Sequence, residues 1–430
     1  MNAWSRHLFL SLAILSSLLA WHQMIFFADT LGSFYTDEVA NVQASDSFLT
    51  SLSYKNDRYG YVYSSGAAVT WPGGLGWKIG HTMLASRISC AFFSWALFLA
   101  LGVYFFYREG FSILTAFLTS AMLWAVTITT PLAMPYWFGF MYDLGELNSI
   151  LLVGWGLMFI SRWPFLSAFI FGLAVWHGKL IYLPLVCAVL LGDVLAKNFP
   201  VKKTLTQLLG LLGVFILPAI LWLIFTCFRL DTHTIHSWLE GQLAWFSSML
   251  SKHKPLPQVF SHQVHWMDRF SSPDLEWSHY STGTKIKNII LSWGAILMAG
   301  ASLFYLKNST GLVSPRGRWT SIMVLLCLAG YSFHFFFLHP FMWQRHFQPA
   351  LYSGLALWVF WGTKWVIFFQ NRLKMALILA VLLILAMQLV SSLKHPLFST
   401  TPTYARACTD LRALSCDPTH KENLPHTIIF

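Results

Sequence analysis

Long apolar stretches separated by short polar connections recur along most of this 430-residue chain. Several of them reach about 20 residues, the length that a helix needs to cross roughly 30 Å of hydrocarbon. The polar–apolar alternation of a membrane barrel is absent from these stretches, so the pattern predicts membrane-spanning helices. About eleven spans are expected from the apolar periodicity, at residues 7–27, 82–106, 112–130, 147–160, 164–177, 180–195, 205–228, 287–306, 320–338, 347–369 and 375–393.

The composition indicates an all-α polytopic membrane protein. Hydrophobic residues make up 56% of the chain and charged residues only 10%, which is too little charge for a soluble domain of this length. The net charge of +11 comes from Lys and Arg residues scattered between the apolar stretches. Because they form no dense basic stripe, nucleic acid is rejected as a partner, and membrane lipids or a lipid phosphate are favoured.

The placement of Lys and Arg predicts how the spans are oriented. One set of short connections, together with Arg6, is expected to be cytosolic because it carries Arg108, Arg162, Lys197, Lys202, Lys203, Lys307, Arg316, Arg318, Arg372 and Lys374. The N-terminus is then cytoplasmic, and residues 28–80, 131–146, 229–286 and the tail from 394 face outward. A bacterial inner membrane is the expected location. The first span is read as an uncleaved anchor, since it is longer than the core of a secretory signal.

The six cysteines fall into two groups. Cys408 and Cys416 lie in the polar tail, where they can form a disulfide if the tail faces an oxidising compartment. Whether they are bridged stays open at this point. The other four lie in apolar stretches and are expected to pack as small hydrophobic residues: Cys90, Cys187, Cys227 and Cys327.

Two adjacent carboxylates, Asp37 and Glu38, follow the first span. A charged side chain at the centre of a bilayer costs roughly 2.5–3.5 kcal/mol, so carboxylates at a membrane edge usually have a function. The plainer alternative is a pair of solvated loop carboxylates. Because most other polar residues of interest also lie on the outer side, the pattern indicates an active site at the outer membrane surface.

Four motifs follow one another in an order known from one class of enzymes. They are Thr36–Ala40, the Gly- and Pro-containing stretch Ser64–Gly80 with Ala85-Ser86-Arg87, Tyr142–Leu147, and Trp343–Leu351 at the head of a late span. In their order and common sidedness they resemble the GT-C class of integral membrane glycosyltransferases. Protein O-mannosyltransferases and lipid A aminoarabinose transferases belong to that class. The chain departs from it at His346, where many relatives have Tyr, and at Ser86, which separates Ala85 from Arg87.

The resemblance implies transfer of a sugar from a polyprenyl-phosphate donor, undecaprenyl or dolichyl, to a lipid, glycan or protein acceptor at the outer face. Asp37 holds the position of the family's acidic pair and is the expected base, because a carboxylate can take the proton of the attacking group. Glu38 orients Asp37, binds the acceptor, or faces away. These alternatives are open in the sequence.

The leaving lipid phosphate needs cationic partners, and a guanidinium is a planar, permanently charged one. Arg345 is the best candidate, with His346 beside it, and Lys78 and Arg87 are further candidates. For each of these cations the alternative is an interfacial side chain that snorkels or anchors its helix.

Two other groups are candidates for acceptor or metal binding. Asp143 and Glu146 share one face if a helix starts there, although helix capping explains them equally well. His262 and His265 have a spacing that can place two imidazoles on one helix face, as metal ligands often are. Interfacial histidines among tryptophans are the plainer account. No cofactor is required, and a divalent metal cation stays an open question.

The expected organisation is one GT-C-like transmembrane domain over residues 1–393 and an extracytoplasmic tail over residues 394–430. Two other function classes remain. A polytopic transporter or lipid flippase would line a path through the bundle with ionisable residues. A membrane subunit that only scaffolds partners would leave Asp37 replaceable without effect.

Overall fold

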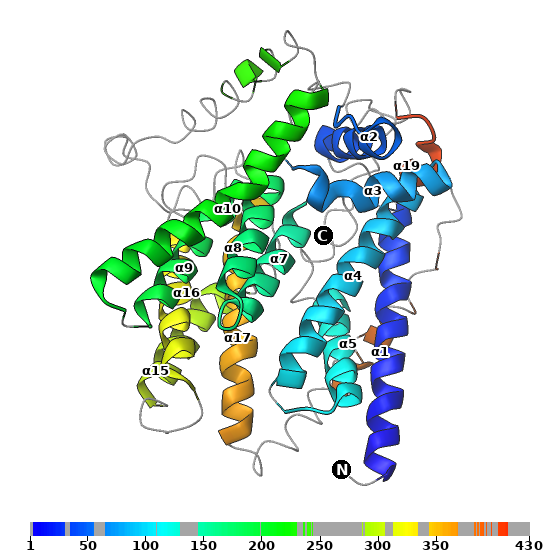
Figure 1. The fold of residues 1–430 in the computed structure, drawn as a ribbon. Helices are drawn as coiled ribbons and strands as arrows, with labels where there is room; N and C mark the ends of the chain where they lie inside the picture. The colour runs from blue at the N-terminus through cyan, green and yellow to red at the C-terminus, as the bar shows by residue number, and fades with distance from the viewer. Residues whose placement is uncertain are drawn as a thin grey trace, which may run out of the picture. The chain divides into compact units, whose positions relative to one another are not determined.

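The computed structural model describes residues 3–30, 35–55, 65–108, 110–129, 145–197, 199–229, 289–305, 313–333, 344–368 and 403–411. It also describes isolated positions within 235–243, at 286, and within 382–397. Every regular element of secondary structure in this part of the chain is a helix (Figure 1), which confirms the predicted all-α class. The chain divides into two compact units. Unit 1 comprises residues 1–158, 176–179 and 375–429, and unit 2 comprises 159–175 and 180–374.

Three helices form the body of unit 1: α1 (Ala3–Thr30), α4 (Met83–Arg108) and α5 (Ile113–Thr129). Helix α5 packs against both α1 and α4. One tryptophan from each helix meets in an aromatic cluster, because Trp21 lies 5.7 Å from Trp95 and 5.5 Å from Trp124 between ring centroids. Such ring contacts add to the burial of apolar area.

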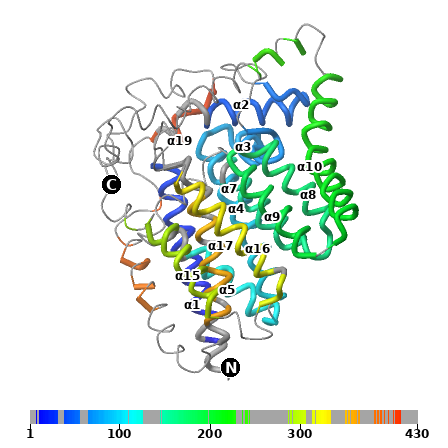
Figure 2. The backbone as a smooth tube through the Cα atoms, turned by 90° about the vertical axis from the view of Figure 1, so that its left-hand side faces the viewer, coloured from blue at the N-terminus to red at the C-terminus, as the bar shows by residue number. Residues whose placement is uncertain are grey.

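Two further helices, α2 (Tyr35–Ser51) and α3 (Ala67–Gly80), lie across the end of unit 1 at which α1 ends and α4 begins (Figures 1 and 2). The sequence analysis placed residues 28–80 between two spans and predicted no helix within them, whereas the structure has α2 and α3 there. Helix α2 is polar in composition, so a search for apolar stretches of membrane length does not detect it. Its inward face is nevertheless buried, including Val39 and Val42.

Glycines allow α3 to approach its neighbours closely. A Cβ atom on Gly74 would lie 2.6 Å from the Ser45 carbonyl carbon and 2.7 Å from the Asp46 backbone nitrogen, both in α2. A Cβ atom on Gly76 would meet the Ala85 carbonyl oxygen and Ser89 of α4. Backbone atoms cannot move aside as a flexible side chain can, so only glycine fits at these positions. Helix α3 is therefore wedged between α2 and α4.

Unit 2 is a bundle of packed helices. Helix α8 (Pro164–Gly172) packs on α10 (Val201–Arg229), and α9 (Leu183–Leu195) packs on α16 (Pro315–Phe333). Helix α17 (Gln344–Phe368) contacts α15 (Ala295–Tyr305), where the Trp365 indole donates to the Ser302 hydroxyl at 2.6 Å. Short π-helical segments cover Leu173–Gly178, whose last residues belong to unit 1, and Ile290–Gly294, and a short 3-10 helix covers Leu180–Tyr182.

Three helices of the described residues are long and apolar enough to cross a membrane: Leu10–Thr30, Met83–Arg108 and Val201–Phe228. They coincide with the predicted spans 7–27, 82–106 and 205–228. Other predicted spans coincide with shorter apolar helices, such as Leu147–Phe159 and Pro164–Gly178. Only isolated positions of the stretch 375–393 are described. The structure thus supports a membrane protein, while the count of about eleven spans stays a prediction.

The close packing of α3 between α2 and α4 can be tested by filling the space at a glycine. We expect Gly74→Ala to destabilise the protein by about 1–3 kcal/mol, the usual cost of overpacking a tight contact. The matched control is Gly300→Ala in α15, where a Cβ atom would meet nothing within 4 Å. That variant should cost nothing, since alanine favours helix over glycine. Thermal unfolding midpoints in detergent compare the two, and equal midpoints would contradict the wedge.

Candidate functional site

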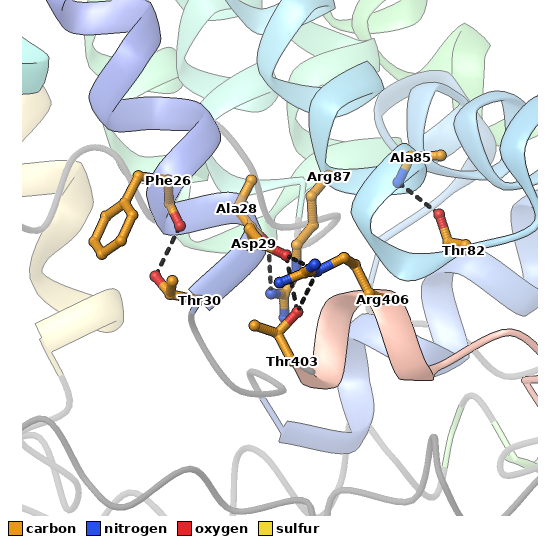
Figure 3. Close-up of polar contacts among 9 residues, drawn as sticks. All are labelled: Phe26, Ala28, Asp29, Thr30, Thr82, Ala85, Arg87, Thr403 and Arg406. Carbon is orange, nitrogen blue, oxygen red and sulfur yellow. Dashed lines mark hydrogen bonds and ion pairs between the residues drawn. The ribbon is translucent and has the colours of Figure 1, made fainter. Parts of the chain in front are cut away.

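Glu38 and Arg87 form a fully buried, bidentate ion pair at the α2–α3 end of unit 1. Arg87 Nε donates to Glu38 Oε1 at 2.7 Å, and Arg87 Nη2 donates to Glu38 Oε2 at 2.9 Å. The relative exposure of both residues is 0%. The same guanidinium donates from Nη1 to the Ala28 carbonyl at 3.1 Å (Figure 3). One arginine of α4 thereby joins the end of α1 to the start of α2.

The helix ends favour the charges that they hold. Ala28 lies in the last turn of α1, where carbonyl groups point outward and a cation is stabilised, and Glu38 lies in the first turn of α2, where an anion is stabilised. The fork of an arginine matches both carboxylate oxygens at once. The pair is therefore well compensated for the loss of water that burial imposes.

A second ion pair lies beside the first. The carboxylate of Asp29, which is also fully buried, accepts hydrogen bonds from Thr403 Oγ1 and from Arg406 Nε, each at 2.8 Å (Figure 3). Arg406 belongs to the short helix α19 (Tyr404–Ala407) in the C-terminal tail. Its side chain keeps 39% of its exposure. Adjacent residues of α1, Ala28 and Asp29, thus each meet a different arginine.

The tail also contacts α2 and α4 directly. The Met83 backbone N–H donates to the Cys408 carbonyl at 3.1 Å, and the Gln43 side chain donates to the Leu411 carbonyl at 3.1 Å. Cys408 is buried in a cluster with Val39, Val42, Trp77 and Met83. Cys408 is disulfide-bonded, as the prediction for the tail allowed, whereas Cys416 lies outside the described residues. The four cysteines of the apolar stretches form no disulfide, and of these Cys90 is buried as expected, whereas Cys187 and Cys227 are exposed.

Buried hydroxyl groups fix α2 against the start of α3. Ser45 Oγ donates to Thr70 Oγ1 at 2.9 Å, and the Tyr54 hydroxyl lies 2.8 Å from Thr70 Oγ1. The Tyr54 hydroxyl also donates to the Ser65 carbonyl at 2.5 Å. Since each buried polar group has a partner, this network holds the two helices in one register.

The start of α7 (Glu146–Phe159) lies against the start of α3. The Asn148 side-chain amide donates to the Val69 carbonyl at 2.8 Å and accepts from Ser94 Oγ at 2.9 Å. Gly145 has a φ of +78°, and a Cβ atom there would lie 2.9 Å from Ser65 Oγ. Glycine suits both the backbone conformation and the close approach. Gly145, at the end of the stretch 131–146 that was predicted to face outward, therefore adjoins Ser65 in the stretch 28–80.

Several predicted site residues are only partly covered by the structure. Asp37 lies in the first turn of α2, Glu146 begins α7, and Arg345 and His346 lie in the first turn of α17. The side chains of these four residues lie outside the described part of the chain, as do Asp143, His262 and His265 entirely. Among the described residues, no three His, Cys, Asp or Glu side chains gather as metal ligands.

Two predicted phosphate-binding residues have protein partners in unit 1. Lys78 Nζ donates to the Leu49 carbonyl in the last turn of α2 at 3.2 Å, at an exposed position. Whether Lys78 binds a phosphate or anchors its helix at a membrane interface stays a prediction. The Arg87 guanidinium is enclosed with Glu38, so a lipid phosphate would reach it only if that pair opened.

The sequence interpretation missed Asp29, Thr403 and Arg406. The available signal for Asp29 was an acidic residue at the end of the first apolar stretch, and for Arg406 a cation in the tail. Nothing in the sequence connects the two.

Comparisons with known proteins find no matching family model, no similar curated protein and no similar solved structure.

The buried pair generates a stability prediction. We expect Arg87→Met to lower the free energy of unfolding by about 3–5 kcal/mol, because it leaves the Glu38 carboxylate buried without its cation. The double variant Glu38→Gln/Arg87→Met should recover part of this loss. Arg108→Met is the control, since its exposed guanidinium donates to the Met158 carbonyl and lies over the Tyr104 ring without pairing with a buried carboxylate in the described residues, and it should cost about 1 kcal/mol or less. The free energy of unfolding in detergent is measured for all three variants. A loss in the double variant that equals the summed losses of the two separate substitutions would contradict the coupling of Glu38 and Arg87.

Proposed function

We propose that the chain is a GT-C-type integral membrane glycosyltransferase that uses a polyprenyl-phosphate sugar donor. One observation carries the proposal, namely that three motifs far apart in the sequence converge at one end of unit 1. Glu38 of the first motif is paired with Arg87 of the second at 2.7 Å. The start of α7, in the third, adjoins Ser65 and Val69 of the second. Helix α1, which ends at this site, is one of the membrane-length helices.

The ion pair separates the roles of the two adjacent carboxylates. Both oxygens of Glu38 accept hydrogen bonds from Arg87, so Glu38 cannot take a proton without losing that pair. We therefore assign Glu38 to positioning, because it fixes the first turn of α2. The base is then Asp37, which precedes it in the same turn.

In the proposed reaction, the acceptor hydroxyl or amide attacks the anomeric carbon of the sugar while Asp37 takes its proton. The bond between that carbon and the phosphate oxygen breaks, so the electron pair leaves with the lipid phosphate and the anomeric configuration is inverted. Arg345 and His346 are the proposed partners of the developing negative charge. The acceptor is a lipid, a glycan or a protein.

A transfer assay on the purified protein tests the base. Radiolabelled undecaprenyl-phosphate and dolichyl-phosphate sugars are offered with and without EDTA, and released lipid phosphate is measured. We expect Asp37→Asn to lower turnover at least about a hundredfold, the usual scale for losing a general base. Asp46→Asn, on the same helix, is the matched control and should retain turnover. Undiminished turnover in Asp37→Asn would refute the assignment, and lipid scrambling without any sugar transfer would favour the flippase reading.

The proposed orientation places the end of unit 1 that holds Glu38 and Arg87, together with the tail, on the periplasmic side of a bacterial inner membrane. The disulfide at Cys408 supports this, because such bonds persist in oxidising compartments. Alkaline phosphatase fused after Phe430 should therefore be active in a bacterial host, and the same enzyme fused after Lys197 should be inactive. The reverse pattern would overturn the orientation.

A further inference from the structure

Residues 403–411, called the C-terminal segment below, form a contact with each of three helices that meet at the candidate site. Thr403 and Arg406 bind Asp29 at the end of α1, the Cys408 carbonyl accepts from Met83 at the start of α4, and the Leu411 carbonyl accepts from Gln43 in α2. The three contacts are spread over the length of the segment. The three contacts therefore fix the C-terminal segment along its whole length rather than at a single point.

The apolar contacts of the C-terminal segment are directed at α2. Cys408 is fully buried against Val39 and Val42, which lie one and four residues after Glu38 on the helix that carries Asp37. Leu411 packs against the same cluster. Because α2 is a short and largely polar helix, its position depends on tertiary packing rather than on its own stability.

The polar contacts join the two arginines through α1. Arg87 binds Glu38 and the Ala28 carbonyl. Arg406 binds Asp29, the next residue of α1, and Figure 3 shows both arginines beside Ala28 and Asp29. A buried carboxylate that loses an arginine partner becomes costly, and it regains water only if the groups around it separate. Without Arg406, the arrangement that encloses Asp29 is therefore expected to open.

We infer that Arg406 and Asp29 are positioning residues, which act through the C-terminal segment to hold α2 and its Asp37 at the end of α1. This role in catalysis rests on the proposed transferase function. The holding of α2 itself is independent of that function and is measurable without any substrate. A tail that adds stability to the whole protein without ordering α2 is the alternative.

Hydrogen exchange of the full-length protein in detergent tests the holding of α2. In Arg406→Ala, we expect backbone amides of residues 403–411 and of α2 to exchange at least about tenfold faster, as in a local opening. Exchange in α5, which the segment does not contact through any of these bonds, should not change. Thr409→Ala is the matched control, because Thr409 is an exposed residue of the same segment. Faster exchange in the segment with unchanged α2 would overturn the inference.

Two further variants keep the test decisive if Arg406→Ala does not fold. Asp29→Asn removes the buried charge itself, so it should fold while still loosening the segment and α2. Arg406→Lys keeps the charge without the planar fork and should exchange at a rate between wild type and Arg406→Ala. Wild-type exchange of α2 in Asp29→Asn would overturn the inference.

The catalytic part has its own readout. With the donor that wild type uses, Asp29→Asn should lower kcat by about tenfold to a hundredfold, the scale expected when a reacting group is misplaced. The KM for the donor should stay near the wild-type value, because the segment holds α2 rather than the lipid. Altered exchange with unchanged kcat would overturn the positioning role. If wild type transfers no sugar, the proposed function fails, and the exchange result still decides whether the segment holds α2.

Discussion

The buried ion pair of Glu38 and Arg87 is the interaction on which the candidate site depends. Each ion loses several kcal/mol of hydration on burial, so the pair is stable only with near-ideal geometry and with its remaining donors engaged. Both conditions hold here, since the fork is bidentate and Nη1 reaches the Ala28 carbonyl. The ends of α1 and α2 add favourable dipoles. Three helices are thereby fixed at one point.

Small residues and hydroxyl groups add to the ion pair in fixing how the helices at this end of unit 1 pack. Gly74 and Gly76 let α3 come within backbone distance of α2 and α4, and the hydroxyls of Ser45, Thr70 and Tyr54 pair across the contact. Their effect is to define one arrangement among the many that apolar packing alone would allow.

The arrangement of charges in unit 1 bears on the choice between enzyme and transporter. Asp29, Arg87 and Arg406 lie together where α1 ends (Figure 3), and Glu38 is paired with Arg87 there. A transport path would place ionisable groups near the middle of the bundle. The proposed function instead requires charged groups gathered at one end of the helices, as these four are.

The sequence by itself determined the all-helical membrane class and the bounds of several helices. Residues 82–106 and 112–130 were expected, and Met83–Arg108 and Ile113–Thr129 are observed. This succeeds because apolar length is a local property that the membrane selects. The polar helix α2 was missed, since its helical state depends on neighbours that hydropathy does not register.

Only the tertiary structure decided which charges meet. Arg87 is 49 residues from Glu38, and Arg406 is 377 residues from Asp29, so no local pattern could connect either pair. The motifs singled out Asp37 and Glu38 together, yet only packing shows that Glu38 is enclosed by an arginine and that the tail reaches the same end. Pairing between distant residues is set by how the chain folds back on itself, and the sequence records only the residues available for it.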